Sequence, residues 1–99
     1  MPLSRDTIKR YRSIGHNLKP VVMISENGLS EGALGELERA LTDHELIKVK
    51  IAVNDRDARK AIIAKLCEHS SAENIQEIGK VALLYRVSNK KGIKTSNVR

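Results

Sequence analysis

Two lysines separated by one residue are the chemical feature that most needs an explanation. Lys48 and Lys50 belong to the segment HELIKVKI (residues 44–51), in which apolar residues alternate with polar or charged ones. This period of two is typical of a half-buried β-strand, so the isoleucine and valine side chains are expected to face a core and the lysines the opposite side. Two ammonium groups about 7 Å apart along a strand repel each other. We therefore expect an anionic partner between them.

A second row of cations lies near the N-terminus. Apolar residues at steps of three and four from Ile8 predict a helix that Ser4 caps and that ends near Gly15. Basic side chains recur along another face of this helix and, with His16, form a ridge suited to a phosphate backbone. A solvated helix face explains the same row nearly as well. The basic residues assigned to the candidate site in this region are Arg5, Lys9, Arg12 and Lys19.

The segment SENGLSEG (residues 25–32) offers backbone donors for a phosphate. It separates a short apolar run from a helical pattern that Ser30 is expected to cap. A glycine turn before the unpaired N–H groups of a helix's first turn concentrates positive potential, and a second glycine in that turn lets a nucleotide backbone approach. A plain turn explains the local pattern equally well. The candidate residues here are Ser25, Asn27, Gly28 and Gly32.

The basic residues are concentrated at the two ends of the chain. Residues 1–20 carry five Lys and Arg side chains and one Asp, whereas residues 88–99 carry four and no acidic residue. The remaining residues hold nine basic and eleven acidic side chains. Basic ends around a near-neutral body favour a polyanionic partner, because Lys and Arg release condensed counterions from phosphates. A merely soluble surface with a basic tail is the alternative.

The periodicity predicts one α/β domain with the element order α-β-α-β-α-β-β. Ninety-nine residues suit a single hydrophobic core. Four strands with intervening helices predict a two-layer sandwich, with a four-stranded mixed sheet whose one face the helices cover. Nothing in the sequence places the first helix. After that helix, the expected elements are a strand at 21–24, a helix from 30 to about 44, a strand within 44–51, a helix from about 55 to 70, a strand around 75–78 and a strand at 81–87.

The last residues differ from this domain. Residues 88–99 have no periodicity, so we expect a flexible basic tail after a single domain at 1–87. No apolar run approaches the roughly 20 residues that span a bilayer, and the charged segment after Met1 leads us to expect no secretory signal. Cys67 is the only cysteine and lies at helical spacing among apolar residues, which favours a structural thiol in a reducing compartment. These features predict a cytoplasmic protein.

Catalytic patterns are incomplete, so we expect no enzyme, no cofactor and no metal. His44 and Glu45 begin like a zinc-protease motif, but Lys48 stands where the second histidine ligand must be. Phe and Trp are absent and Tyr11 and Tyr85 are the only aromatic residues, so the stacking platforms of an RNA recognition motif cannot be built. Any nucleic acid must be held mainly through phosphates, riboses and shape.

Three segments in this order resemble a known family: LKPVVMISENGLSEGALGELERAL, HELIKVKI and IGKVALLYR. The chain is similar, from about Leu3 to Arg86, to the chloroplast RNA splicing and ribosome maturation (CRM) domain, in particular its small free-standing bacterial YhbY-type form. The resemblance implies a fold like the C-terminal domain of translation initiation factor 3. It also implies RNA binding, because the bacterial single-domain members are associated with precursors of the large ribosomal subunit.

The resemblance extends to candidate site residues. Family members carry a Gly-x-x-Gly loop, analogous to the loop with which KH domains clamp backbone nucleotides. Gly28 matches the second glycine, but Ser25 occupies the place of the first. A serine hydroxyl can bond a phosphate, although serine is less free than glycine at positive φ. The residues that match basic positions of the family in the other two segments are Lys48, Lys50, Lys80 and Arg86.

Two hypotheses of different classes follow. The first is a monomeric RNA-binding assembly factor that holds ribosomal RNA of a large-subunit precursor and takes no small-molecule substrate. The second is a ribosome-associated adaptor that binds protein and does not recognise RNA directly. The salt dependence of binding distinguishes these hypotheses. Each phosphate contact lowers log affinity by about 0.7 to 0.9 per unit of log salt concentration, whereas the affinity of a partner bound through apolar burial depends little on salt.

Overall fold

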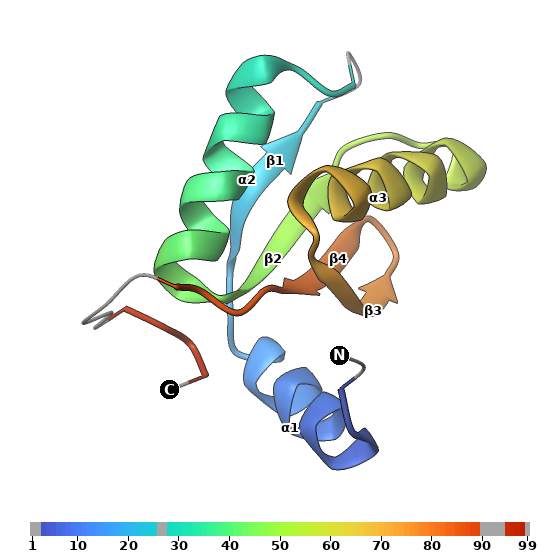
Figure 1. Cartoon of the computed structure of the whole chain (residues 1–99). Coiled ribbons are helices and arrows are strands. Elements are labelled where there is room, and N and C mark those ends of the chain that lie inside the picture. The colour runs from blue at the N-terminus through green and yellow to red at the C-terminus, as the bar shows by residue number, and fades with distance from the viewer. Residues whose placement is uncertain (1–2, 26–27, 90–94, 99) are drawn as a thin grey trace.

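A computed structural model describes residues 3–25, 28–89 and 95–98. The predicted order of elements and the α/β fold class are confirmed (Figure 1). The fourth strand is shorter than expected, because it ends at Tyr85. The elements are α1 (Arg5–Gly15), β1 (Pro20–Ile24), α2 (Glu31–His44), β2 (Leu46–Ile51), α3 (Arg56–Ser70), β3 (Glu73–Ile78) and β4 (Val81–Tyr85).

Each helix begins at a side chain that accepts a hydrogen bond from the first turn. The Ser4 hydroxyl accepts from the Thr7 N–H at 3.1 Å, and the Ser30 hydroxyl accepts from the Ala33 N–H at 3.1 Å. The Asp55 carboxylate does the same for α3, at 2.8 Å from the Ala58 nitrogen. Such caps satisfy backbone donors that have no partner within the helix. Both predicted serine caps are confirmed.

The four strands form one mixed sheet in the order β1-β2-β4-β3. β1 runs parallel to β2, whereas β4 is antiparallel to both β2 and β3. The helices α2 and α3 cover one face of this sheet and enclose the main core. Ile47, Val49 and Ile51 are buried in that core, as the alternation in β2 predicts. The lysines of β2 therefore face the other side.

The first helix packs on the opposite face of the sheet, at the end where β2 begins. A second apolar cluster joins Tyr11 of α1 to Leu46, Ile75 and Leu83 of three strands. The Tyr11 ring also lies 4.8 Å from the Tyr85 ring, measured between centroids, in a tilted arrangement. Tyr11 is therefore buried and Tyr85 partly buried, and the described residues leave part of this sheet face beyond α1 uncovered. We call the uncovered part the open face.

A glycine sets the distance between α1 and the sheet. Gly15, the last residue of α1, is buried, and a Cβ atom built on it would lie 2.6 Å from one methyl carbon of Leu83 and 2.9 Å from the other. Real Cβ atoms do not approach other heavy atoms so closely. Only glycine lets α1 come this near to β4, because close-packed interiors do not absorb an added methyl group without movement.

The C-terminal residues dock where α2 passes into β2. The Thr95 hydroxyl donates to the Asp43 carbonyl at 2.8 Å, and the Asn97 side chain donates to the Leu46 carbonyl at 2.7 Å. The buried Glu45 carboxylate accepts from the Ser96 hydroxyl at 2.8 Å. Residues 95–98 therefore differ from the flexible tail that the sequence predicts, because polar groups of the α2–β2 junction bind them. Residues 90–94 and 99 lie outside the described part.

Glu45 shapes that junction. It has φ of 62°, an uncommon conformation for a residue with a side chain, and it is 1 % exposed. Its carboxylate accepts from the Ser88 N–H at 2.7 Å, and its carbonyl accepts from the Arg86 N–H at 2.9 Å. These bonds stabilise the conformation that turns α2 into β2.

Replacement of Gly15 by alanine is expected to destabilise the protein by about 1–3 kcal/mol, because the added methyl group overlaps Leu83. The measurement is the free energy of unfolding in urea. Gly35→Ala is the matched control, since a Cβ there meets only the Arg39 guanidinium at 3.8 Å within α2. The control should stabilise by up to about 1 kcal/mol. Equal effects of the two substitutions would contradict the close approach of α1.

Candidate nucleic-acid interface

Lys48 and Lys50 project from the open face of the sheet. In the register, Lys48 pairs with Leu83 and Lys50 pairs with Val81, so the lysines share a face with the residue that contacts α1. Lys50 is exposed and Lys48 is half-buried. The rest of this face carries apolar side chains unusually open to solvent, with Met23 at 59 % and Ile78 at 59 % exposure. Cations therefore lie among exposed apolar groups.

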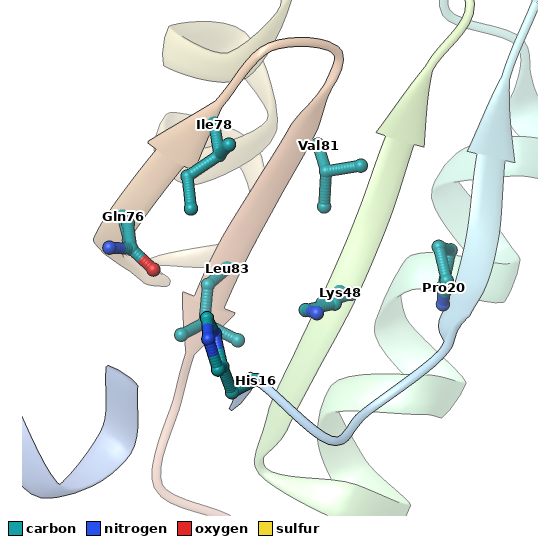
Figure 2. Close-up of a pocket in the computed structure, with 7 residues that line it drawn as sticks. All are labelled: His16, Pro20, Lys48, Gln76, Ile78, Val81 and Leu83. Atoms are coloured by element: carbon teal, nitrogen blue, oxygen red, sulfur yellow. The ribbon is translucent and has the colours of Figure 1, made fainter. Parts of the chain in front are cut away.

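The cationic ridge of α1 leads onto this face. One hollow is lined by Lys9, Arg12 and Ser13 of α1, together with His16 and Gln76. A second, larger hollow shares His16 and Gln76 and extends over the sheet to Lys48 (Figure 2). The structure thus brings part of the predicted helix ridge and a predicted strand lysine to one continuous surface.

Of two further predicted residues, Lys19 lies beside this surface and Arg5 lies away from it. Lys19 lines a third hollow together with Lys48, so the segment between α1 and β1 adds a cation on the β1 side. Arg5 is exposed at the start of α1, a full helix length from His16. It lines none of the three hollows. Arg5 is therefore the predicted helix residue that the geometry leaves outside the cationic surface.

The glycine turn and Lys80 lie at the other end of the sheet. The parallel strands β1 and β2 end together, since the Ala52 N–H donates to the Ile24 carbonyl at 2.8 Å. The loop after β1 begins with Ser25, whose carbonyl accepts from the Gly28 N–H at 2.9 Å. Gly28 has φ of 82° and open space around it, as a turn with a permissive residue requires. The predicted contact Asn27 lies outside the described residues.

Lys80 is held against this edge. Its ammonium group donates to the Asn54 side-chain oxygen at 2.6 Å, and its carbonyl accepts from the Ile51 N–H at 2.7 Å. Gly32, in the first turn of α2, has open space where a side chain would lie. A nucleotide backbone can thus approach the N-terminus of α2 without a clash. Lys50 directly precedes Ile51, whose N–H binds the Lys80 carbonyl. Lys50 therefore lies on the open face, next to this edge of the sheet.

The first turns of α3 hold a group of cations that are not among the predicted site residues. Arg56, Arg59 and Lys60 line a polar hollow of about 360 Å³ beside Gly79, and the Glu77 carboxylate lines it as well. The Arg59 guanidinium donates to the Val53 and Asn54 carbonyls at 2.8 Å, so it also fixes the loop before α3. The signal was present in the sequence, because spacings of three and four place these residues on one helix face.

Arg86 has a structural role. Its guanidinium donates to the Glu38 carboxylate at 2.6 Å, to the Thr42 hydroxyl at 3.1 Å and to the Ser70 carbonyl at 3.0 Å. The Arg86 side chain is only 20 % exposed. It ties the chain after β4 to α2 and to the end of α3. The geometry therefore separates Arg86 from the other predicted contacts.

Three further features concern a cysteine nucleophile, a metal site and a membrane-spanning helix. Burial raises the pKa of the Cys67 thiol, and the carboxylates of Glu73 and Glu77 raise it further, which disfavours the thiolate that a nucleophile requires. Among residues 3–25, 28–89 and 95–98, no three His, Cys, Asp or Glu side chains gather where they could hold a metal ion. None of the helices in these ranges is long and apolar enough to cross a membrane.

The fold and these surfaces define a small α/β domain with an electropositive open sheet face and a glycine turn at a helix N-terminus, a class suited to polyanions. The sequence pattern of the CRS1 / YhbY (CRM) domain matches residues 3–86. The chain belongs to this family, as its three segments predict.

Relatives agree with this assignment. A probable RNA-binding protein of Pseudomonas aeruginosa is 52 % identical over 99 % of this chain and 94 % of its own length. An RNA-binding protein of Haemophilus influenzae is 47 % identical over 78 % of each chain. The solution structure of a Staphylococcus aureus protein, described as an RNA-binding candidate, superposes with a TM-score of 0.78 at 30 % identity. It covers 91 % of this chain and 94 % of its own.

Replacement of Arg86 by alanine is expected to lower stability by roughly 1–3 kcal/mol, because the Ser70 carbonyl and the Glu38 carboxylate lose a donor. The measurement is urea unfolding. Arg39→Ala, at an exposed position of α2, should change stability by less than about 0.5 kcal/mol. RNA affinity of folded Arg86→Ala should equal that of the unaltered protein. A stable variant that binds RNA poorly would place Arg86 in the interface instead.

Proposed function

We propose that this protein binds RNA, without catalysis, through the phosphates of a strand that crosses the open face. One observation carries the proposal. The ridge of α1, the segment before β1 and strand β2 contribute cations to three hollows. The central hollow shares His16 and Gln76 with the hollow on α1, and Lys48 with the hollow on the β1 side. None of the described residues that line these hollows is acidic. Phosphates can therefore replace water around these cations without meeting a carboxylate.

The proposed path has two ends. At one end the strand meets Lys9 and Arg12 of α1, and at the other it reaches Lys50 and the turn at Gly28. Lys48 lies between, so the cations are distributed along the strand direction of β2 and not gathered at one point. An extended polyanion suits such a row better than a compact anion. The names of the relatives, an RNA-binding protein and a probable RNA-binding protein, support RNA as this polyanion.

Arg86 is left out of the proposed contacts because its guanidinium is held by α2 and α3. Arg56 and Lys60 join them, because the hollow that they line beside Gly79 has three cations against the one carboxylate of Glu77 among its described residues. The proposed target is ribosomal RNA of a large-subunit precursor in the cytoplasm. Support for that target comes from the family resemblance alone.

Reversal of Lys48 and Lys50 together to glutamate is expected to weaken binding to single-stranded RNA by roughly tenfold or more. It should also reduce the slope of log affinity against log salt by about 1.4, the contribution of two phosphate contacts to a single strand. Affinity is measured by fluorescence anisotropy at several salt concentrations, and stability by urea unfolding. Stability should change little, because Lys50 is exposed and Lys48 is half-buried.

The matched control reverses Arg39 and Lys65 to glutamate. Both are exposed on the helices that cover the other face, and the change in net charge is the same. Binding by the control should fall much less. If the two double variants weaken binding equally, net charge and not the open face attracts RNA. If salt and both variants leave binding to a ribosomal particle unchanged, the protein-binding adaptor replaces this proposal.

Replacement of Gly32 by alanine is expected to weaken RNA binding a fewfold without loss of stability. Within the chain the new methyl group meets only the Ser30 hydroxyl oxygen, at 3.9 Å. Alanine also stabilises a helix by up to about 1 kcal/mol relative to glycine. Any loss of affinity must then come from a ligand that approaches the backbone there. Gly35→Ala in the same helix is the control. Equal affinity of all three proteins would remove the start of α2 from the interface.

A further inference from the structure

The hollow on the open face is not built for phosphate alone. It has a volume of about 320 Å³, and all four strands contribute to it (Figure 2). Its floor consists of the apolar side chains of Leu83, Val81 and Ile78, with Pro20 at the β1 side. Phosphate gains nothing from contact with such side chains. A ligand that fills this hollow must carry an apolar or aromatic surface together with negative charge.

The polar groups of the hollow stand around its floor. The register aligns Lys48 with Leu83 and Leu83 with Gln76, so these three side chains form one row across three neighbouring strands. The strand spacing separates Lys48 from Gln76 by about 10 Å, with Leu83 between them. His16 at the end of α1 limits the hollow on its remaining side. Leu83 is only 3 % exposed beneath α1, so a planar group would lie on Val81 and Ile78, with the Lys48 ammonium and the Gln76 amide beside it.

An unpaired nucleobase with its phosphate has these properties. A base presents an apolar face to the floor and hydrogen-bonding groups at its edge, and a side-chain amide can both donate to and accept from that edge. Bases taken out of a stack are held between aromatic or apolar side chains, so the lack of an exposed aromatic ring is no obstacle. Lys48 and the adjoining Lys9 and Arg12 are placed for the flanking phosphates.

A protein side chain is a poorer occupant. Ile78 is 59 % exposed, and an apolar partner could cover it, but the cations around the hollow would then lose water without gaining an anion. None of the described residues that line the hollow offers a carboxylate to compensate them. Charge complementarity therefore favours a nucleotide over an apolar peptide.

We propose that the hollow lined by Leu83, Val81 and Ile78 holds one unpaired base of the bound RNA, with Gln76 at the base edge. This inference rests on the proposed RNA binding and adds to it a source of base preference. Contacts to phosphate position a strand, whereas contacts to a base edge discriminate between sequences.

The test compares strands that have bases with a strand that has none. The probes are short single-stranded oligomers of uridine, cytidine or adenosine, and an abasic ribose-phosphate strand of equal length. The protein should bind at least one of the oligomers fivefold or more tightly than the abasic strand. Gln76→Leu should reduce the differences among the three oligomers, because the amide is lost while the volume is kept.

Ile78→Ser removes part of the apolar floor and should reduce the ratio of base-containing to abasic affinity toward one. Val87→Ser is the matched control, since Val87 is 61 % exposed and lies outside the hollow. It should leave the ratio unchanged. Reversal of Lys48 and Lys50 should weaken binding to all strands, the abasic one included.

The outcomes separate this inference from the function on which it rests. A ratio near one in the unaltered protein, with salt-dependent binding to every strand, overturns the base pocket and leaves phosphate binding in place. No binding to any strand overturns both. A ratio above five that Ile78→Ser and Val87→Ser lower equally also overturns the pocket. A ratio that only the pocket variants lower supports it.

Discussion

The close approach of α1 to the sheet is the constraint on which the candidate interface depends. Gly15 meets Leu83 with no room for a methyl group, and this contact places the helix on the face opposite α2 and α3. The ridge of α1 consequently ends beside the sheet at His16. If α1 packed elsewhere, Lys9 and Arg12 would lie apart from Lys48. A single small residue thus brings cations distant in the sequence to one surface.

The two faces of the sheet have different physical roles. The face under α2 and α3 carries the main core, and burial of its apolar side chains provides the main stabilisation of the fold. Among the described residues, the other face is covered by α1 and by Leu3, Leu18 and Val98, which pack beside it. Beyond α1 it exposes apolar side chains and lysines together, a combination that does not stabilise the isolated domain. Such a surface is understandable when a partner covers it, and RNA has both the charge and the apolar faces to do so.

Some of the candidate site could be predicted from the sequence and some could not. Lys48 and Lys50 were recognisable because the alternation in β2 fixes their face whatever the rest of the fold does. Arg86 matched a basic position of the family, but charge alone does not show whether a guanidinium meets solvent or a carboxylate. Its partners Glu38 and Ser70 are 48 and 16 residues away along the chain. Only packing brings such groups together.

The sequence by itself determined the order of the elements, the serine caps of α1 and α2, the inward face of β2 and the family, because each of these depends on residues close together in the chain. The tertiary structure decided where α1 packs, how residues 95–98 bind the α2–β2 junction, and that a hollow with an apolar floor lies beside Lys48. These features arise from contacts between residues far apart in the chain. Local periodicity carries no information about them, since it records only which side of an element is apolar.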